Sequence, residues 1–274
     1  MSNTFPTVLS VTSGKGGVGK TNISVNLALC LTRLGKRCVI LDADLGLANV
    51  DVVLGLAPER NLFHVFQDNM TMRDILLPTE YGFSILPAAS GVSEMLSLST
   101  GQKLELLEAM DILENTVDVL IVDTGAGIND NVVYFNLAAQ ERLVVVTPEP
   151  TSLTDAYALI KVMKVKHGVD KFHILVNMGK DEKSSKAIFS KLYNACDHFL
   201  SGVSLGYVGC IPLDAQVRQA VIQQKPFCAL HPHSEAASAM ERVAQHIARW
   251  KPMDHLDGNI KFFWKKLLFA EGTA

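Results

Sequence analysis

The chain has 274 residues and a formal net charge of −3, and its composition is 48% hydrophobic and 19% charged. This length and apolar fraction predict one α/β domain with at most a small appendage, and they exclude a largely disordered chain. The slightly acidic balance argues against a globally basic nucleic-acid-binding surface, and five scattered cysteines without a CxxC pair favour reduced thiols in a cytoplasmic protein.

The first predicted unit is a strand, a glycine-rich loop and a helix. Val8–Val11 is a strand-like apolar run, and Ile23–Leu34 carries apolar residues at helical spacing. Residues 14 to 21 between them read GKGGVGKT, the phosphate-binding P-loop pattern G-x-x-x-x-G-K-T. In this pattern Lys20 is expected to reach the β- and γ-phosphates and the Thr21 hydroxyl to bind Mg²⁺. Lys15 is a second lysine in the loop, which suggests a role beyond binding the loop's own nucleotide.

Apolar runs and helical patterns alternate along the rest of the chain. Further strands are expected at Cys38–Leu41, Phe83–Leu86, Val119–Val122, Leu143–Val146, Phe172–Val176 and Leu205–Ile211. Helices are expected at Leu104–Leu113, Leu153–Val165, Ser184–Phe199 and Ser234–Arg249, the last with Ser234 as its N-cap. Apolar runs without alternation indicate strands that are buried on both faces. The pattern predicts an α/β fold with a doubly wound, mainly parallel sheet of about seven to eight strands and helices on both faces.

Three carboxylates follow predicted strands, where a doubly wound sheet places its ligands. Asp123 closes the run Val119–Val122 before a glycine-rich turn, as a Walker B Mg²⁺ site requires. Asp42 and Asp44 end the second strand, and they could hold Mg²⁺-bound water and polarise the water that attacks the γ-phosphate. The pattern does not assign which of these two acids has which role. Asn177 follows a later strand and could grip adenine, although taken alone it is more typical of a turn.

The C-terminal segment is set apart from the body by a Lys-Pro-Met-Asp break. We expect an ATPase domain over residues 1–250, a linker over 251–257 and an amphipathic helix over 258–270. Its apolar stripe is predicted to comprise Ile260, Phe263, Trp264, Leu267 and Leu268, with three lysines off the stripe. A basic amphipathic helix of this kind fits reversible binding to a membrane surface. The alternative is a helix docked on its own domain, and the two arrangements could alternate.

Lys15, Asp44 and Asp123 occur together with four longer stretches, at residues 11–22, 41–51, 87–91 and 148–161. With these features the sequence resembles the deviant-Walker-A P-loop ATPases of the MinD/ParA type. Within that group it looks like the FlhG (FleN) branch of flagellar-number regulators. The stretch at 148–161 looks like a hallmark of this branch, whereas the P-loop marks only the wider superfamily.

The resemblance implies a dimer with two ATP molecules between facing subunits and with Mg²⁺ as the metal. Lys15 then reaches the phosphates of the partner's nucleotide, Asp44 positions the attacking water, and Asp123 is the switch II acid; these three are the implied catalytic residues. The implied metal-site residues are Thr21, Asp42 and Asp123. The implied nucleotide contacts are Gly14, Lys15, Gly16, Gly17, Val18, Gly19, Lys20, Thr21, Asn22, Glu149, Asn177, Pro212 and Asp214.

The resemblance also implies a slow regulatory ATPase that controls flagellar number, placement and gene expression. The implied partners are a second copy of the chain, the inner face of the cytoplasmic membrane, and one of three flagellar proteins: an FlhF-type GTPase, a switch or C-ring protein, or a transcription regulator. The protein is then cytoplasmic and reversibly peripheral on the membrane, with the cell pole as a candidate place. The alternative is a ParA-like DNA-partition ATPase whose ATP dimer binds DNA nonspecifically, which the net charge and the tail disfavour.

Two departures from the family pattern bear on these expectations. Switch II has glycine at position 125, where relatives more often have alanine, and glycine gives the backbone of the switch more freedom. Only Met1–Thr7 precede the first strand, so we expect no N-terminal glutamine-containing activator helix for FlhF.

Overall fold

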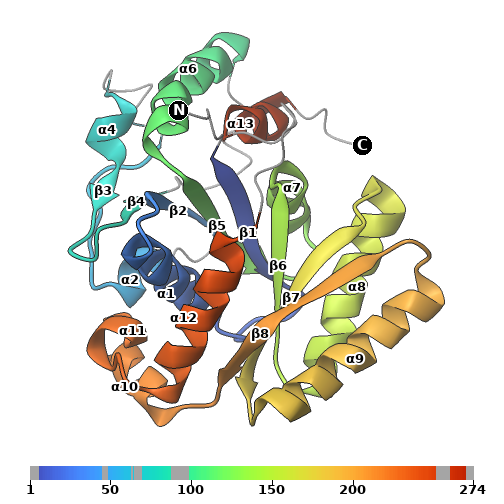
Figure 1. Cartoon of the computed structure of the whole chain (residues 1–274). Coiled ribbons are helices and arrows are strands. Elements are labelled where there is room, and N and C mark those ends of the chain that lie inside the picture. Colours follow the sequence, from blue (N-terminus) through green and yellow to red (C-terminus); the bar gives the residue numbers. More distant parts are fainter. Residues whose placement is uncertain are drawn as a thin grey trace.

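The computed structural model describes residues 6–44, 49–62, 64, 70–87, 99–250 and 260–269. Its centre is an eight-stranded sheet in the order β3-β4-β2-β5-β1-β6-β7-β8 (Figure 1). The strands are β1 (Thr7–Ser13), β2 (Cys38–Ala43), β3 (Leu77–Pro78), β4 (Ser84–Leu86), β5 (Val119–Ala126), β6 (Glu141–Val146), β7 (Lys171–Gly179) and β8 (Ser204–Pro212). All neighbours pair in parallel except β3 and β4. The seven predicted strands are therefore confirmed, and the mainly parallel sheet with them.

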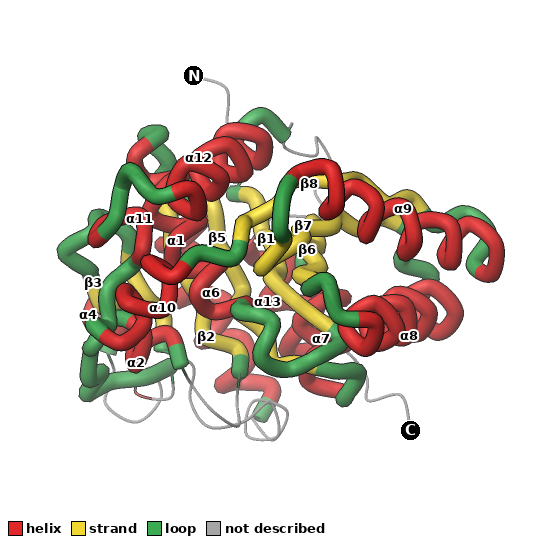
Figure 2. The backbone as a smooth tube through the Cα atoms, turned by 90° about the horizontal axis from the view of Figure 1, so that it is seen from below, coloured by secondary structure: helices red, strands yellow, loops and turns green. Residues whose placement is uncertain are grey.

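Helices cover both faces of this sheet, as Figure 2 shows in a view from below. One face packs against α1 (Lys20–Arg33), α11 (Phe227–Leu230) and α12 (Glu235–Ala248). The other packs against α6 (Thr100–Thr116), α7 (Asp130–Ala138), α8 (Pro150–His167), α9 (Glu182–Phe199) and α13 (Ile260–Phe269). The shorter helices are α2 (Val50–Val53), α4 (Met72–Ile75) and α10 (Ala215–Ile222).

The period-2 alternation of strand side chains divides the core between the two faces. On β1, the side chains of Leu9 and Val11 pack on the face that α1 and α12 cover. The side chain of Val8 packs on the opposite face, with α6 and α13. Because both faces are covered, the central strands read as continuous apolar runs, and this made them recognisable in the sequence. All five cysteines are free and buried, as expected. The Ser234 hydroxyl accepts a hydrogen bond from the Ala237 amide and so caps α12, as predicted.

Two features differ from the sequence expectation. Strand β5 does not end before Asp123 but continues to Ala126, because Thr124 pairs with Ala43 and Ala126 pairs with Ser13. The edge strand β3 was not predicted, since two residues are too few to carry a periodic signal.

Helix α13 lies against α6, α7 and the amino end of β1 (Figure 1). Of its predicted apolar stripe, Phe263, Trp264 and Leu268 are buried in the same cluster as Leu106 and Phe135 of the domain. The side chains of Ile260 and Leu267 lie outside the described residues, and so does the expected linker over 251–257. The tail is thus docked on its own domain, one of the two arrangements that the sequence left open. None of the described helices is long and apolar enough to span a bilayer.

Candidate active site

The predicted site residues gather at the carboxyl edge of the sheet, where β1, β2, β5, β6 and β7 end. The P-loop connects β1 to α1 at this edge, in the lower half of the view in Figure 1. Helix α1 begins directly after the loop, so its free N–H groups and positive dipole end point toward the space above the loop. A phosphate chain is the ligand that such an arrangement favours.

Two glycines of the loop are required by close approach. A Cβ at Gly14 would lie 2.1 Å from the backbone carbonyl of Asp155, so α8 packs directly against the loop. At Gly19, φ is +90° and a Cβ would lie 2.6 Å from the side-chain nitrogen of Asn177. Asn177 in turn donates a hydrogen bond to the Val18 carbonyl at 2.7 Å. The loop is therefore held from two sides in a shape that side chains at these positions would break.

Lys20 points inward from the first turn of α1. Its ammonium donates a hydrogen bond to the Ser13 hydroxyl at 3.1 Å, and the residue is buried. Burial lowers the pKa of Lys20, whereas the negative charges of Asp123 and Asp44 raise it. A buried cation at the N-terminus of α1 fits an anionic ligand such as the phosphates of a nucleotide.

Asp123 is fully buried next to the P-loop helix. Its carboxylate accepts a hydrogen bond from the Ser24 hydroxyl at 2.8 Å, and the nearby Thr21 hydroxyl lowers its pKa. Burial, helped by the negative charge of Asp42, raises the pKa of Asp123 to about 7. A buried carboxylate close to the P-loop threonine suits Mg²⁺, which prefers one or two carboxylates together with water and phosphate oxygens. Ser24 was not predicted as a site residue from the sequence, although it lies one helical turn after Thr21, on the same face of α1.

Asp42 lies beside Asp123 in the register of β2 and β5, but its carboxylate has other partners. One oxygen accepts hydrogen bonds from the amides of Asn49 and Val50, both at 3.0 Å, and the other accepts from the Asp44 amide at 3.2 Å. Burial nevertheless raises the pKa of Asp42 to about 6. This acid thus holds the start of α2 and the segment that carries Asp44.

Asp44 lies just beyond β2 and faces β5. A Cβ at Gly125 would come within 3.3 Å of one Asp44 carboxylate oxygen and within 3.5 Å of a Val132 methyl group. Glycine at this switch II position therefore makes room for Asp44. The sequence reasoning considered only the backbone freedom of this glycine, because contact between residues 44 and 125 is visible only once β2 and β5 are side by side.

Lys15 is turned toward α8 within the same chain. Its ammonium forms an ion pair with the Glu149 carboxylate and donates a hydrogen bond to the Thr151 hydroxyl at 2.9 Å. Both Lys15 and Glu149 are partly exposed. Thr151 is a further polar residue of the site that the sequence reasoning did not single out.

The remaining predicted contacts lie at the ends of β7 and β8. Pro212 pairs with Gly179 in the register of these strands, and Asp214 caps α10 by accepting from the Gln216 amide at 2.8 Å. Between them Leu213 is largely exposed, and the neighbouring Met178 is half-exposed with φ of +57°. Exposed apolar side chains next to the P-loop form a surface on which a flat base could stack.

Comparison with known proteins agrees with this geometry. The ParA family model, described as NUBPL iron-transfer P-loop NTPase, matches residues 4–248. The chain is 49% identical over 267 residues to the antiactivator FleN of Pseudomonas aeruginosa, covering 97% of this chain and 95% of the relative. It is 30% identical to the flagellum site-determining protein YlxH of Helicobacter pylori, covering 95% of this chain and 89% of the relative. Among solved structures, the cell division ATPase MinD of Pyrococcus furiosus matches with a TM-score of 0.70 and 26% identity, covering 89% of this chain and 98% of that one.

The matched residues include the P-loop and the two acids Asp42 and Asp123. The chain belongs to the ParA/MinD family of P-loop NTPases.

Proposed function

We propose that the protein is a slow regulatory ATPase that dimerises around ATP and controls flagellar number, placement and gene expression. The observation that carries the proposal is a P-loop with a second lysine, flanked by Asp44 and the buried Asp123, in a chain 49% identical to an antiactivator FleN. The 30% identity to a flagellum site-determining protein supports the same assignment.

In this proposal the residues of the carboxyl edge divide the work of phosphoryl transfer, which is mostly positioning and charge stabilisation. Thr21 and Asp123 hold Mg²⁺, and Lys20 binds the β- and γ-phosphates. Asp44 orients the attacking water. Asp42 contributes negative charge on the metal side and keeps the segment of Asp44 in place through its backbone hydrogen bonds. Magnesium supplies charge neutralisation on the phosphates.

Lys15 makes the dimer depend on the nucleotide. In the single chain its charge is balanced by Glu149, and both side chains are accessible to a second subunit. ATP on the facing subunit offers Lys15 a denser negative charge than one carboxylate, and Glu149 then approaches the partner's nucleotide. An ADP-bound subunit lacks the γ-phosphate, so it is less favourable there for Lys15 to leave Glu149 and bind the phosphates of the facing subunit.

The base and the rest of the nucleotide extend from the P-loop toward the ends of β7 and β8. We assign Asn177, Pro212 and Asp214 to the adenine side of the site. One amide hydrogen of Asn177 is already bonded to the P-loop, so its contact with the base uses the remaining donor or the carbonyl oxygen.

Sizing the protein with ATP, ADP and no nucleotide tests the central claim. Wild type should form dimers with ATP and Mg²⁺ only. Asp44→Ala should accumulate the ATP dimer because hydrolysis is blocked, whereas Lys15→Ala should neither hydrolyse ATP nor dimerise well. A wild type that stays monomeric with ATP and Mg²⁺ would remove the sandwich mechanism.

We also propose that α13 alternates between the docked position and the cytoplasmic membrane. Its buried side chains Phe263, Trp264 and Leu268 supply apolar surface that interfacial binding needs, and two tails in one dimer raise the effective concentration at the bilayer. The buried Trp264 indole nitrogen has no hydrogen-bond partner among the described residues, a feature that weakens docking. Co-sedimentation with anionic liposomes should increase with ATP over ADP, and equal binding in both states would contradict the proposal.

The partner that reads the dimer is a flagellar transcription regulator in this proposal, because the most similar relative reported above is called an antiactivator. Affinity capture of purified regulator on Asp44→Ala loaded with ATP, with Lys15→Ala as the matched control, tests this choice. Retention on Lys15→Ala equal to that on Asp44→Ala would show that the regulator does not read the ATP dimer.

A further inference from the structure

A groove lies between α13, α7 and the end of α8, at the end of the sheet opposite the P-loop. Its volume is about 550 Å³, and Leu137, Val169 and Phe269 are among the side chains that form its apolar walls. Arg142, Lys265 and Lys266 bring positive charge to it, and none of the described lining residues is a carboxylate. Two carboxylates outside the lining, those of Glu141 and Asp170, lie near enough to Arg142 to raise its pKa.

The charge of Arg142 is fixed in position. Its guanidinium donates hydrogen bonds to the carbonyls of Asn136, Ala139 and Gln140 at 2.7, 2.6 and 3.2 Å, at the C-terminus of α7. These bonds use three of the five N–H donors of the guanidinium and hold it at the wall of the groove. Burial lowers the pKa of Arg142 to about 10, which leaves the group protonated at neutral pH.

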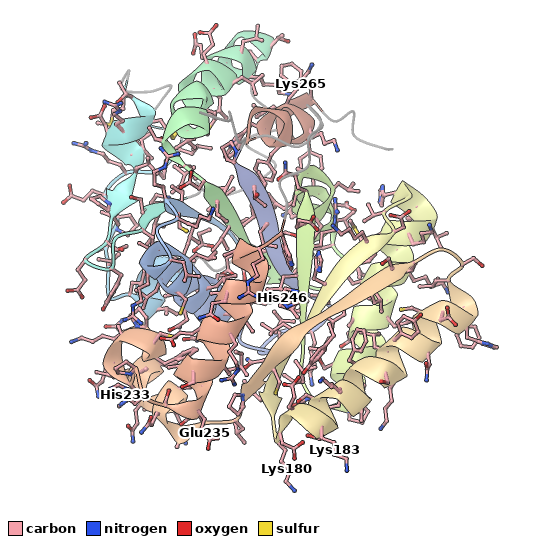
Figure 3. All side chains as sticks on the ribbon, viewed as in Figure 1. Lys180, Lys183, His233, Glu235, His246 and Lys265 are labelled. Carbon is pink, nitrogen blue, oxygen red and sulfur yellow. The ribbon has the colours of Figure 1, made fainter. Side chains whose placement is uncertain are left out.

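The other two cations come from α13 itself. Lys265 and Lys266 are exposed on its middle turn, and Figure 3 shows Lys265 at the end of the molecule far from Lys180 and Lys183. On the side facing α6, the Lys103 ammonium lies 5.6 Å from the centre of the Phe269 ring. An apolar wall with cations at its rim is the result.

The lining narrows the choice of ligand. A small inorganic anion would leave the apolar walls uncovered, and a neutral apolar molecule would not use the cations. The volume lies within the usual range of small-molecule sites, about 300–1,000 Å³. We propose that the groove binds a single-chain anionic amphiphile such as a fatty acid, with its head group toward Arg142 and Lys265 and its chain along Leu137, Val169 and Phe269.

Binding at this place has a consequence for the tail. Because α13 supplies one wall and two of the cations, the ligand binds the docked arrangement and not the released one. By mass action, a free ligand concentration of ten times Kd favours the docked state by about elevenfold. The groove thus makes the position of α13 respond to a soluble lipid metabolite.

The test is a titration with the fluorescent probe 11-(dansylamino)undecanoic acid, below its micelle concentration and without nucleotide or vesicles. We expect saturable binding that decanoate displaces, whereas decanol, acetate and inorganic phosphate displace it at least tenfold less well. If decanol displaces the probe as effectively as decanoate does, the site binds apolar chains without selecting the carboxylate. If phosphate displaces it, the site binds anions without selecting the apolar chain. Either result overturns the proposal.

Variants locate the site. Lys265→Glu should weaken binding about tenfold, because charge reversal at the rim repels the head group. Lys183→Glu is the matched control, on an exposed lysine at the opposite end of the molecule, and should bind like wild type. Val169→Glu places a carboxylate on the wall without altering α13 and should also weaken binding.

The emission of Trp264, measured in a Trp250→Phe background, reports whether α13 stays docked in each variant. If Lys265→Glu releases the helix, the affinity of Val169→Glu decides whether the probe binds in the groove. Unchanged affinity in Val169→Glu, or equal losses in Lys183→Glu and Lys265→Glu, would refute the assignment. The titration needs neither ATP nor a membrane, so its failure leaves the proposed ATPase function untouched.

Discussion

Replacing Phe135 by leucine tests whether the docked position of α13 competes with membrane binding. Phe135 of α7 is buried, and its ring stacks on Phe263 of α13 with centroids 6.5 Å apart and an interplanar angle of 23°. Such an aromatic pair contributes about 0.5–1.5 kcal/mol beyond the burial of area. Leucine keeps an apolar side chain in the core but loses this pair. The docked-to-released ratio of α13 should therefore fall about two- to twelvefold.

The assay is co-sedimentation with vesicles that contain anionic phosphatidylglycerol, without nucleotide. The bound fraction of Phe135→Leu should rise, because its membrane-facing tail is unchanged while its receptor surface on the domain is weakened. Trp264 emission should shift to longer wavelength in the absence of vesicles, as the indole leaves the core.

Phe172→Leu is the matched control for this experiment. Phe172 is equally buried, but it packs in the cluster of α8 and α9, away from α13. Both variants lose core packing, so a general loss of stability affects them alike. If vesicle binding rises equally in both variants, or in neither, then docking of α13 does not compete with the membrane and the reasoning is wrong.

Three further predictions concern the nucleotide site. Gly14→Ala should abolish ATP binding in calorimetry, because its Cβ would lie 2.1 Å from the α8 backbone, whereas Gly16→Ala, whose Cβ would meet only one methyl group at 4.0 Å, should bind at least tenfold better than Gly14→Ala. Gly125→Ala should lower kcat about tenfold with little change in the affinity for ATP, because the new methyl group displaces Asp44; an unchanged kcat would show that this room is not needed. The raised pKa of Asp123 means that the folded protein binds a proton more tightly than the unfolded chain does, so this group's contribution to stability falls as pH rises from about 4 to about 7. In urea unfolding without nucleotide, the free energy of unfolding should fall less over this pH range in Asp123→Asn than in wild type. Equal falls in both proteins would contradict the assignment.

Much of the nucleotide site could be predicted because its signals are local. The spacing of glycine, lysine and threonine in the P-loop follows from the geometry of one turn, and the strand before it and the helix after it are marked by periodicity. The places of Asp42 and Asp123 toward the carboxyl edge of the sheet follow from the rule that parallel strands present their ligands at that edge. The contacts of these residues could not be predicted. Asp42 accepts hydrogen bonds from the amides of Asn49 and Val50, because the chain after β2 brings these amides to its carboxylate.

Lys15 and the apolar stripe of the C-terminal helix show the same division between local signal and tertiary contact. The sequence by itself determined that Lys15 is a surplus cation in a P-loop and that residues 260–268 carry an apolar stripe at helical spacing. Only the tertiary structure decided that Lys15 pairs with Glu149, 134 residues away, and that Phe263, Trp264 and Leu268 of the stripe are buried on the domain. The physical reason is that the hydrophobic effect is not directional, so one stripe suits a protein groove or a bilayer equally well. Which of them it covers depends on the surface that α6 and α7 present, and no local pattern in the tail encodes that surface.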